Sequence, residues 1–109
     1  MSKVYLTQEI PTDRETGKPK YSIAGAAKYG EIVTLLPMYS QIIYSPGPAV
    51  QKLKGLLNNF TSEDYLLCAG DPAIMCAVTS IITQLTNGKF KLLKWDRQEK
   101  SYYVLNFDI

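Results

Sequence analysis

Short apolar runs alternate with amphipathic stretches along this chain, and most runs end at a glycine, a proline or a polar cluster. Residues 4–10 combine β-branched, aromatic and aliphatic side chains and stop at Pro11, which predicts a first strand. Residues 12–20 are polar and include a glycine and a proline, a composition typical of a mobile loop.

A short helix and two strands are expected next. Ser22 can cap a helix through Tyr29, and Gly30 can end it in the left-handed conformation. Residues 31–36 form a compact apolar run, which predicts a strand covered on both faces. Residues 41–44 are expected to follow as an antiparallel return strand.

The clearest helical pattern begins at Pro48, because proline suits the first turn of a helix. Apolar residues then recur at the spacing of one helix face: Val50, Leu53, Leu56, Leu57 and Phe60. Lys52, Lys54 and Asn58 fall on the opposite face, which we expect to contact water. This periodicity predicts an amphipathic helix over 48–60.

A buried strand and an apolar helix are expected after this. Residues 65–69 are wholly apolar and predict a central strand. Asp71 can cap a helix that starts at Pro72, where the missing amide proton costs little. The helix over 72–85 is apolar on nearly all sides and stops before an Asn-Gly pair. Such a helix should be buried by neighbouring elements or by a partner subunit.

Segments 90–95 and 102–107 flank a polar connector, which predicts a C-terminal hairpin. Two strand–helix–strand passages precede it and require right-handed parallel crossovers. The expected fold class is therefore α/β, with residues 1–109 as a single compact domain. Its sheet should be mixed but largely parallel, with about five strands, helices packed on it and an antiparallel hairpin at the C-terminal end.

Composition excludes several classes of function. The 109 residues are 46% hydrophobic, which is enough for one core without disulfide or metal staples. A formal net charge of +2 is too small to argue for a polyanionic partner by itself. The absence of histidine removes Ser-His-Asp and Cys-His catalysis and imidazole metal ligands. Cys68 and Cys76 have apolar neighbours, so both are expected to be buried, reduced thiols.

Neither a secretory signal nor a membrane span is expected. Residues 1–6 contain no extended apolar segment of the kind found in signal peptides. The most apolar window, 72–82, is too short to cross a bilayer. We therefore expect a cytoplasmic protein.

Three stretches of the chain carry a family resemblance. They are VYLTQEIP at 4–11, DYLL at 64–67 running into GDPA at 70–73, and NG at 87–88 followed by KLLKWDR at 91–97. Together they resemble a group of small proteins of unknown function from tailed bacteriophages and phage-rich environmental samples. The similarity covers most of the chain. It implies a phage or prophage origin and action in the host cytoplasm, and it carries no activity over to any residue.

The turn into the helix over 72–85 is one candidate site. A helix N-terminus at the carboxyl end of a strand offers amides and a favourable dipole to an anion. Gly70, Asp71 and Ala73 would line such a site for a phosphate or a nucleotide. The turn lacks GxGxxG and a Walker lysine, and Asp71 carries the wrong charge. The alternative is a capped helix start, in which Asp71 itself binds the amides.

The predicted hairpin is a second candidate, because basic and aromatic side chains interleave along it. The set comprises Lys89, Lys91, Lys94, Trp95, Arg97 and Tyr102. Such a surface can hold single-stranded nucleic acid or bind a protein partner. The alternative is an exposed edge that lysines guard against sheet-to-sheet association. Lys89 and Lys91 should alternate to one face of the strand, with Phe90 and Leu92 on the other.

No catalytic set is recognisable, since Asp13 and Glu15 fall in a loop and Glu63 and Asp64 suit the turn before a strand. We therefore expect a non-enzymatic protein with no metal and no cofactor. Eight tyrosines and the apolar helix favour self-association or binding of a host or phage protein. Two alternatives are anion or nucleotide-phosphate binding, including hydrolysis, at the strand–helix turn and nucleic-acid binding by the hairpin.

Overall fold

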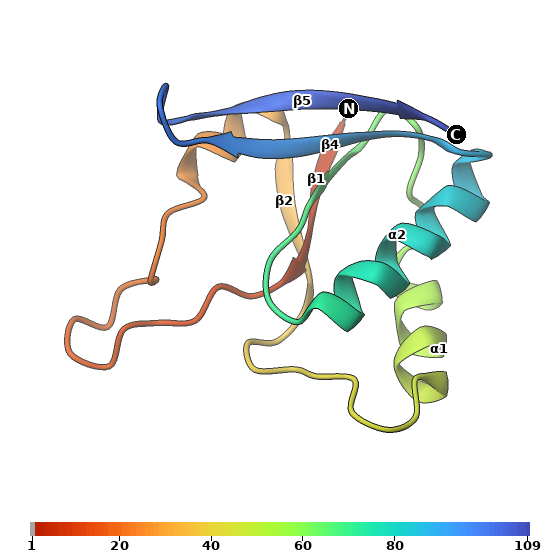
Figure 1. Ribbon diagram of the computed structural model, residues 1–109, viewed down its shortest axis with the longest axis horizontal. Coiled ribbons are helices and arrows are strands. Elements are labelled where there is room, and N and C mark those ends of the chain that lie inside the picture. The colour runs from red at the N-terminus through yellow and green to blue at the C-terminus, as the bar shows by residue number, and fades with distance from the viewer. Residues whose placement is uncertain (1) are drawn as a thin grey trace.

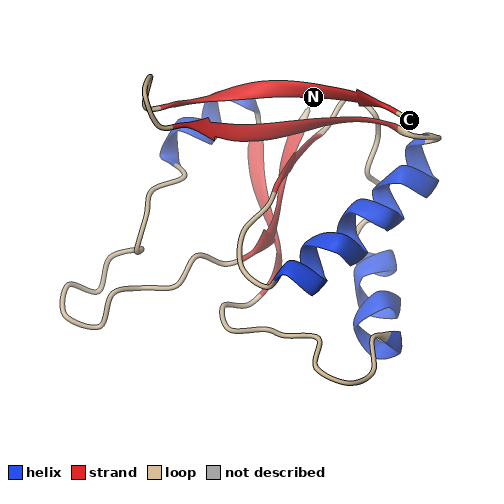
Figure 2. Cartoon of the chain, in the orientation of Figure 1, coloured by secondary structure: helices blue, strands red, loops and turns tan. Residues whose placement is uncertain are grey.

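The computed structural model describes residues 2–109, which form one sheet and three helices (Figures 1 and 2). The strands are β1 (Lys3–Gln8), β2 (Glu31–Leu36), β3 (Tyr65–Leu67), β4 (Lys89–Asp96) and β5 (Ser101–Asp108). The helices are the 3₁₀ helix η1 (Ala24–Tyr29) and the α-helices α1 (Gly47–Leu56) and α2 (Pro72–Thr86). Strand order is β2-β1-β3-β4-β5, with the β4–β5 pair antiparallel and the other pairs parallel. The predicted α/β class and the C-terminal hairpin are confirmed.

Helices cover both faces of this sheet. Helices α1 and α2 lie on one face, over a core to which Tyr5, Leu66 and Phe90 contribute from the strands. Helix η1 lies on the other face, over a smaller core that includes Val4 and Leu6. Neighbouring residues of a strand thus enter different cores, as the alternation of side chains requires. The β4–β5 hairpin runs nearly crosswise to β1 and β2 in Figure 1, because strands of a sheet twist relative to one another.

The chain adds strands first on one side of β1 and then on the other. The chain leaves β1 through η1 to reach β2, and then crosses through α1 to β3 on the other side of β1. Helix α2 and the hairpin continue outward from β3. The carboxyl ends of β1 and β3 therefore flank the crevice at which open α/β sheets bind ligands.

Most predicted elements are present within a few residues. The run over 31–36 is β2 with the predicted bounds, and α2 ends at Thr86, with Asn87 as its C-cap at a left-handed φ of 58°. Helix α1 is a turn shorter than predicted, although Leu57 and Phe60 beyond its end still pack in the core. Leu56, which was assigned to the apolar face, is exposed.

Glycine is required where η1 ends. The N-cap of η1 is Ile23 and makes no side-chain capping bond, so the prediction that Ser22 caps the helix is wrong; the Ser22 hydroxyl accepts from the Ala24 amide at 3.1 Å in the turn that precedes it. Gly30 is the C-cap, but its φ of 155° and ψ of 176° lie outside the predicted left-handed helical conformation, in a region that other residues rarely adopt. A Cβ at this position would collide with the carbonyl oxygen of Ser2.

The return strand predicted over 41–44 is wrong. Tyr39 adopts a φ of 65° and turns the chain, and the segment that follows is a loop. The Ile42 amide donates to the Asp71 carboxylate at 2.9 Å rather than to a strand, and Tyr44 is 97% exposed. β2 therefore pairs with β1 alone and lies at an edge of the sheet.

The prediction that α2 is buried on most sides is also wrong. Its buried residues form one face: Ile74, Val78, Ile81 and Ile82. Cys76, Ser80 and Gln84 are exposed, so the expected burial of Cys76 is not found. The apolar composition was misleading because the outer positions hold uncharged residues that tolerate water, and even Leu85 is 48% exposed. No helix within residues 2–109 combines the length and apolar character needed to cross a membrane.

Replacing Ile82 by alanine should lower the free energy of unfolding by about 2–5 kcal/mol, because this side chain is fully buried. Ser80→Ala, on the exposed face of the same helix, is the matched control and should change that free energy by less than about 0.5 kcal/mol. Urea unfolding followed by circular dichroism measures both. Equal losses in the two variants would contradict the assigned buried face.

Candidate functional site

The crevice between the carboxyl ends of β1 and β3 is filled by the chain's own polar side chains. The Thr7 hydroxyl donates to the Ala69 carbonyl at 2.6 Å and accepts from the Ala69 amide at 2.8 Å. The Gln8 side-chain oxygen accepts from the Asp71 amide at 2.9 Å, and its nitrogen donates to the Ser40 carbonyl at 2.8 Å. Thr7 and Gln8 are buried. They occupy the position at which related sheet topologies hold a ligand.

Gly70, Asp71 and Ala73 lie together beside this crevice, where α2 begins. The Asp71 carboxylate accepts from the Ala73 amide at 3.2 Å, which confirms the predicted helix cap, and its other oxygen accepts from the Ile42 amide. Gly70 has a φ of 86°, and a side chain there would collide with the Gln8 carboxamide. The amides of residues 71 and 73 are thus already engaged within the protein.

Anion binding at this turn stays a prediction. Thermal unfolding in the presence of inorganic phosphate tests it, because a ligand at 100 times its dissociation constant stabilises the folded state by about 2.7 kcal/mol. No change in unfolding temperature across the titration would exclude phosphate as the ligand.

The basic residues of the hairpin do not share one surface. Lys89, Lys91 and Trp95 alternate to the face of β4 that η1 covers, whereas Lys94 lies on the opposite face. Arg97 lies in the exposed turn between β4 and β5. Nucleic-acid binding by this set stays a prediction, and it requires an affinity that falls steeply with salt concentration.

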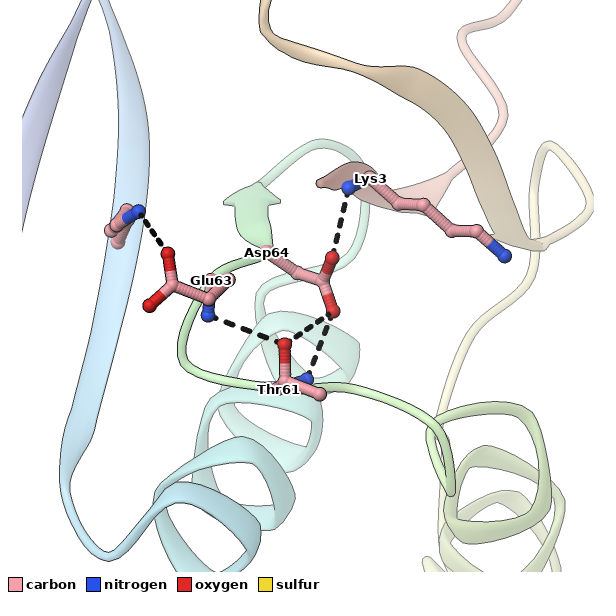
Figure 3. Close-up of polar contacts among 5 residues, drawn as sticks. Lys3, Thr61, Glu63 and Asp64 are labelled. Atoms are coloured by element: carbon pink, nitrogen blue, oxygen red, sulfur yellow. Dashed lines mark hydrogen bonds and ion pairs between the residues drawn. The ribbon is translucent and has the colours of Figure 1, made fainter. Parts of the chain in front are cut away.

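The acidic residues of the turn before β3 make hydrogen bonds and an ion pair within the protein (Figure 3). The buried Asp64 carboxylate accepts from the Lys3 amide at 2.8 Å and from the Thr61 amide at 2.9 Å. The Glu63 carboxylate lies 3.5 Å from the Lys91 ammonium group, so this lysine is already paired. The prediction that Glu63 and Asp64 serve the turn before a strand is confirmed. Within residues 2–109, no three cysteine, aspartate or glutamate side chains converge as metal ligands.

An apolar hollow opens on the η1 face beside the carboxyl ends of β3 and β4. Its volume is about 570 Å³, and it is lined by Leu6, Tyr21, Ser22, Ile23, Leu67, Cys68, Ala69, Leu92, Leu93, Lys94, Trp95 and Tyr102. The Trp95 and Tyr102 rings meet edge to face, with centroids 5.0 Å apart, and Tyr102 is only 7% exposed. Burial, and to a lesser extent Cys76, raises the pKa of the Cys68 thiol to about 11. The Cys68 side chain packs against the core beneath α1 and α2, on the opposite face of the sheet, and its thiol is protonated at neutral pH. The hollow therefore offers apolar contacts rather than a thiol nucleophile.

An edge of the sheet was expected at the hairpin from the sequence, but it was not foreseen that the outer edge, on β5, is unguarded. β5 is the last strand of the sheet, so within residues 2–109 no strand pairs with its outer side. Its 8 residues, SYYVLNFD, include Asp108 as the one charged side chain and contain no lysine, arginine or proline. Natural edge strands usually carry such residues, which prevent pairing with other chains. The expectation that lysines guard this edge is wrong, because they lie on β4, inside the sheet.

Three side chains of β5 alternate to the face on which α1 and α2 lie, and we call them the β5 row: Tyr103, Leu105 and Phe107. Phe107 stacks on Phe90, with ring centroids 4.9 Å apart, and Phe90 belongs to the core beneath α2. Tyr103 and Phe107 nevertheless remain 39% and 38% exposed. The row therefore extends the apolar core outward to an uncovered edge. Its lack of charge was readable from the sequence, but the sequence did not show that β5, and not the lysine-bearing β4, is the outermost strand.

The two cysteines should react at very different rates with Ellman's reagent at pH 8. Cys76 is exposed on α2 and should react quickly. Cys68 should react slowly in the native protein, because its raised pKa leaves about 0.1% of the thiol ionised at this pH. Cys76→Ser should abolish the fast phase alone. Two fast thiols in the native protein would contradict the raised pKa and the partial burial of Cys68.

One protein family matches nearly the whole chain. The family is described as "Phage Pam3 gp32-like protein", and its sequence model matches residues 2–109. Comparison with curated proteins finds no match, and neither does comparison with solved structures. The phage resemblance carried by the three sequence stretches is confirmed. This chain belongs to the Phage Pam3 gp32-like protein family.

Proposed function

We propose that this phage protein acts by binding another polypeptide along the outer edge of β5, without catalysing a reaction. The observation that carries the proposal is the unguarded edge strand together with the exposed β5 row. A long, apolar edge strand without such protection is a site at which another chain can pair. Exposed apolar patches on a protein of this size commonly mark interaction surfaces.

The other edge of the sheet is less suited to this role. β2 has 6 residues, and none of the large hydrophobic side chains exposed in residues 2–109 belongs to it. Its Val33 packs against the core beneath α1 and α2, and its Ile32 packs against the core beneath η1. A strand added beside β2 would find no exposed apolar row to cover. β5 offers both an edge and such a row.

The available stretch of β5 begins after its first residues. The Tyr29 hydroxyl of η1 donates to the Tyr102 carbonyl at 3.1 Å, so this end of the strand is already tied to the protein. Tyr103 to Phe107 remain for a bound strand. In recognition of this kind, backbone hydrogen bonds supply affinity, and the alternate side chains on one face supply specificity.

Tyr103→Lys should reduce capture of the bound polypeptide at least about tenfold, a loss of about 1.4 kcal/mol. The new ammonium group would guard the edge in the way that natural edge strands use lysine. Gln51→Lys adds the same charge at an exposed position of α1 and is the matched control. The measurement is affinity capture from phage-infected host cells, with each captured chain identified by mass spectrometry.

Thermal unfolding of both variants shows whether they remain folded. The proposal requires an identified polypeptide, another copy of this chain included, that Gln51→Lys retains and Tyr103→Lys loses. Equal capture by the two folded variants, or capture of no polypeptide by the unaltered protein, would overturn it.

A further inference from the structure

We infer that the polypeptide bound along β5 is β5 of a second copy of this chain, paired antiparallel about a two-fold axis at Leu105. This inference rests on the function proposed above and names its partner. Its basis is that the strand is complementary to itself in charge, in side-chain pattern and in the length of free edge.

Charge permits identical strands to face each other here. The free stretch from Tyr103 to Phe107 carries no ionised side chain, so pairing with its own copy opposes no like charges. Like charges directly opposite in a sheet are destabilising. The lysines that would repel one another in such a pair lie on β4, one strand farther in.

The alternation of side chains restricts the register. Residues directly opposite in an antiparallel pair project from the same face of the sheet. If both β5 rows are to lie on one face, the two-fold axis must therefore run between one residue and the same residue of the partner subunit. With the axis at Leu105, Tyr103 opposes the partner subunit's Phe107, and Leu105 opposes the partner subunit's Leu105. Aromatic pairs of this kind stabilise a sheet.

Neighbouring registers lack these aromatic pairs. An axis at Val104 places Tyr103 opposite the partner subunit's Leu105, and Phe107 opposite the partner subunit's Ser101. An axis at Asn106 places Leu105 opposite the partner subunit's Phe107, and Tyr103 opposite the partner subunit's Ile109. The axis at Leu105 also centres the pair on the free stretch, because Tyr103 and Phe107 are equally distant from it.

The assembled pair would form one continuous sheet. Two sheets of five strands would join edge to edge, with α1 and α2 of both copies on the same side. The stacked rings of Phe90 and Phe107 would then continue onto the partner subunit's Tyr103. An edge that is open in one copy is thereby closed in the pair, which removes its unpaired backbone groups from water.

Cysteine cross-linking tests the register directly. In a Cys76→Ser background, which removes the exposed thiol, Leu105→Cys places two thiols opposite each other across the axis. Directly opposite Cβ atoms lie about 4.5–5.5 Å apart, whereas the diagonal pair formed by Asn106→Cys lies about 7–8 Å apart. Disulfides need the shorter separation. Diamide should therefore cross-link the Leu105→Cys variant at least about ten times faster than the Asn106→Cys control.

A mixture of Val104→Cys and Asn106→Cys, each in the Cys76→Ser background, provides a second measurement on the opposite face. These positions oppose each other in the proposed register, so the mixture should cross-link faster than either variant alone. Sedimentation equilibrium of the unaltered protein should give a mass that rises with concentration from 12.2 kDa toward twice that value.

The outcomes separate this inference from the proposed function. Equal cross-linking of Leu105→Cys and Asn106→Cys overturns the register, and a mass of 12.2 kDa at all concentrations overturns self-pairing. In the second case, another captured polypeptide that Tyr103→Lys loses would leave the proposed function standing. If the folded Tyr103→Lys variant also captures the same polypeptides as the unaltered protein, both the proposed function and this inference fail.

Discussion

The parallel pairing of β1 with strands on both sides is the constraint on which the rest of the structure depends. Parallel neighbours cannot be joined by tight turns, so the chain must cross the sheet each time it adds a strand. One crossing contains η1 and covers one face, while α1 and α2 cover the other. With β2 on one side of β1, the strands β3, β4 and β5 extend from the other side. The final hairpin therefore leaves β5 at an edge.

In this topology, the crevice at which open α/β sheets bind ligands lies away from the edge strand β5, where the backbone is open to another chain. The crevice beside β1 is closed, because Thr7 and Gln8 bind the backbone of the segment that leads into α2. Those bonds satisfy buried polar groups and hold the start of α2 against the sheet. The edge of β5 differs from this crevice, because its outer backbone pairs with no strand of residues 2–109 and its aromatic side chains are partly exposed. This contrast underlies the proposal that the protein binds a polypeptide along β5.

Local patterns predicted most elements, but they gave one strand that does not exist and misjudged the surroundings of one helix. The spacing of apolar residues located α1, and the Asp71-Pro72 pair located the start of α2. The same reasoning expected a strand over 41–44, because β-branched residues favour extended backbone. That segment instead forms a loop, whose Ile42 amide bonds to Asp71. The outer face of α2 was expected to be buried, but its uncharged residues, Leu85 included, are exposed.

For the candidate sites too, some features could be predicted from the sequence and others only from the tertiary structure. The sequence by itself determined the parallel and antiparallel segments, the cap at Asp71, the role of Asp64 in its turn and the membership in a phage family. The cap and the turn depend on residues near one another in the chain. Only the tertiary structure decided that the lysines lie on an inner strand and that Tyr103, Leu105 and Phe107 line an open edge. Strand order is a product of long-range pairing, and no local pattern of apolar and polar residues encodes which strand is last.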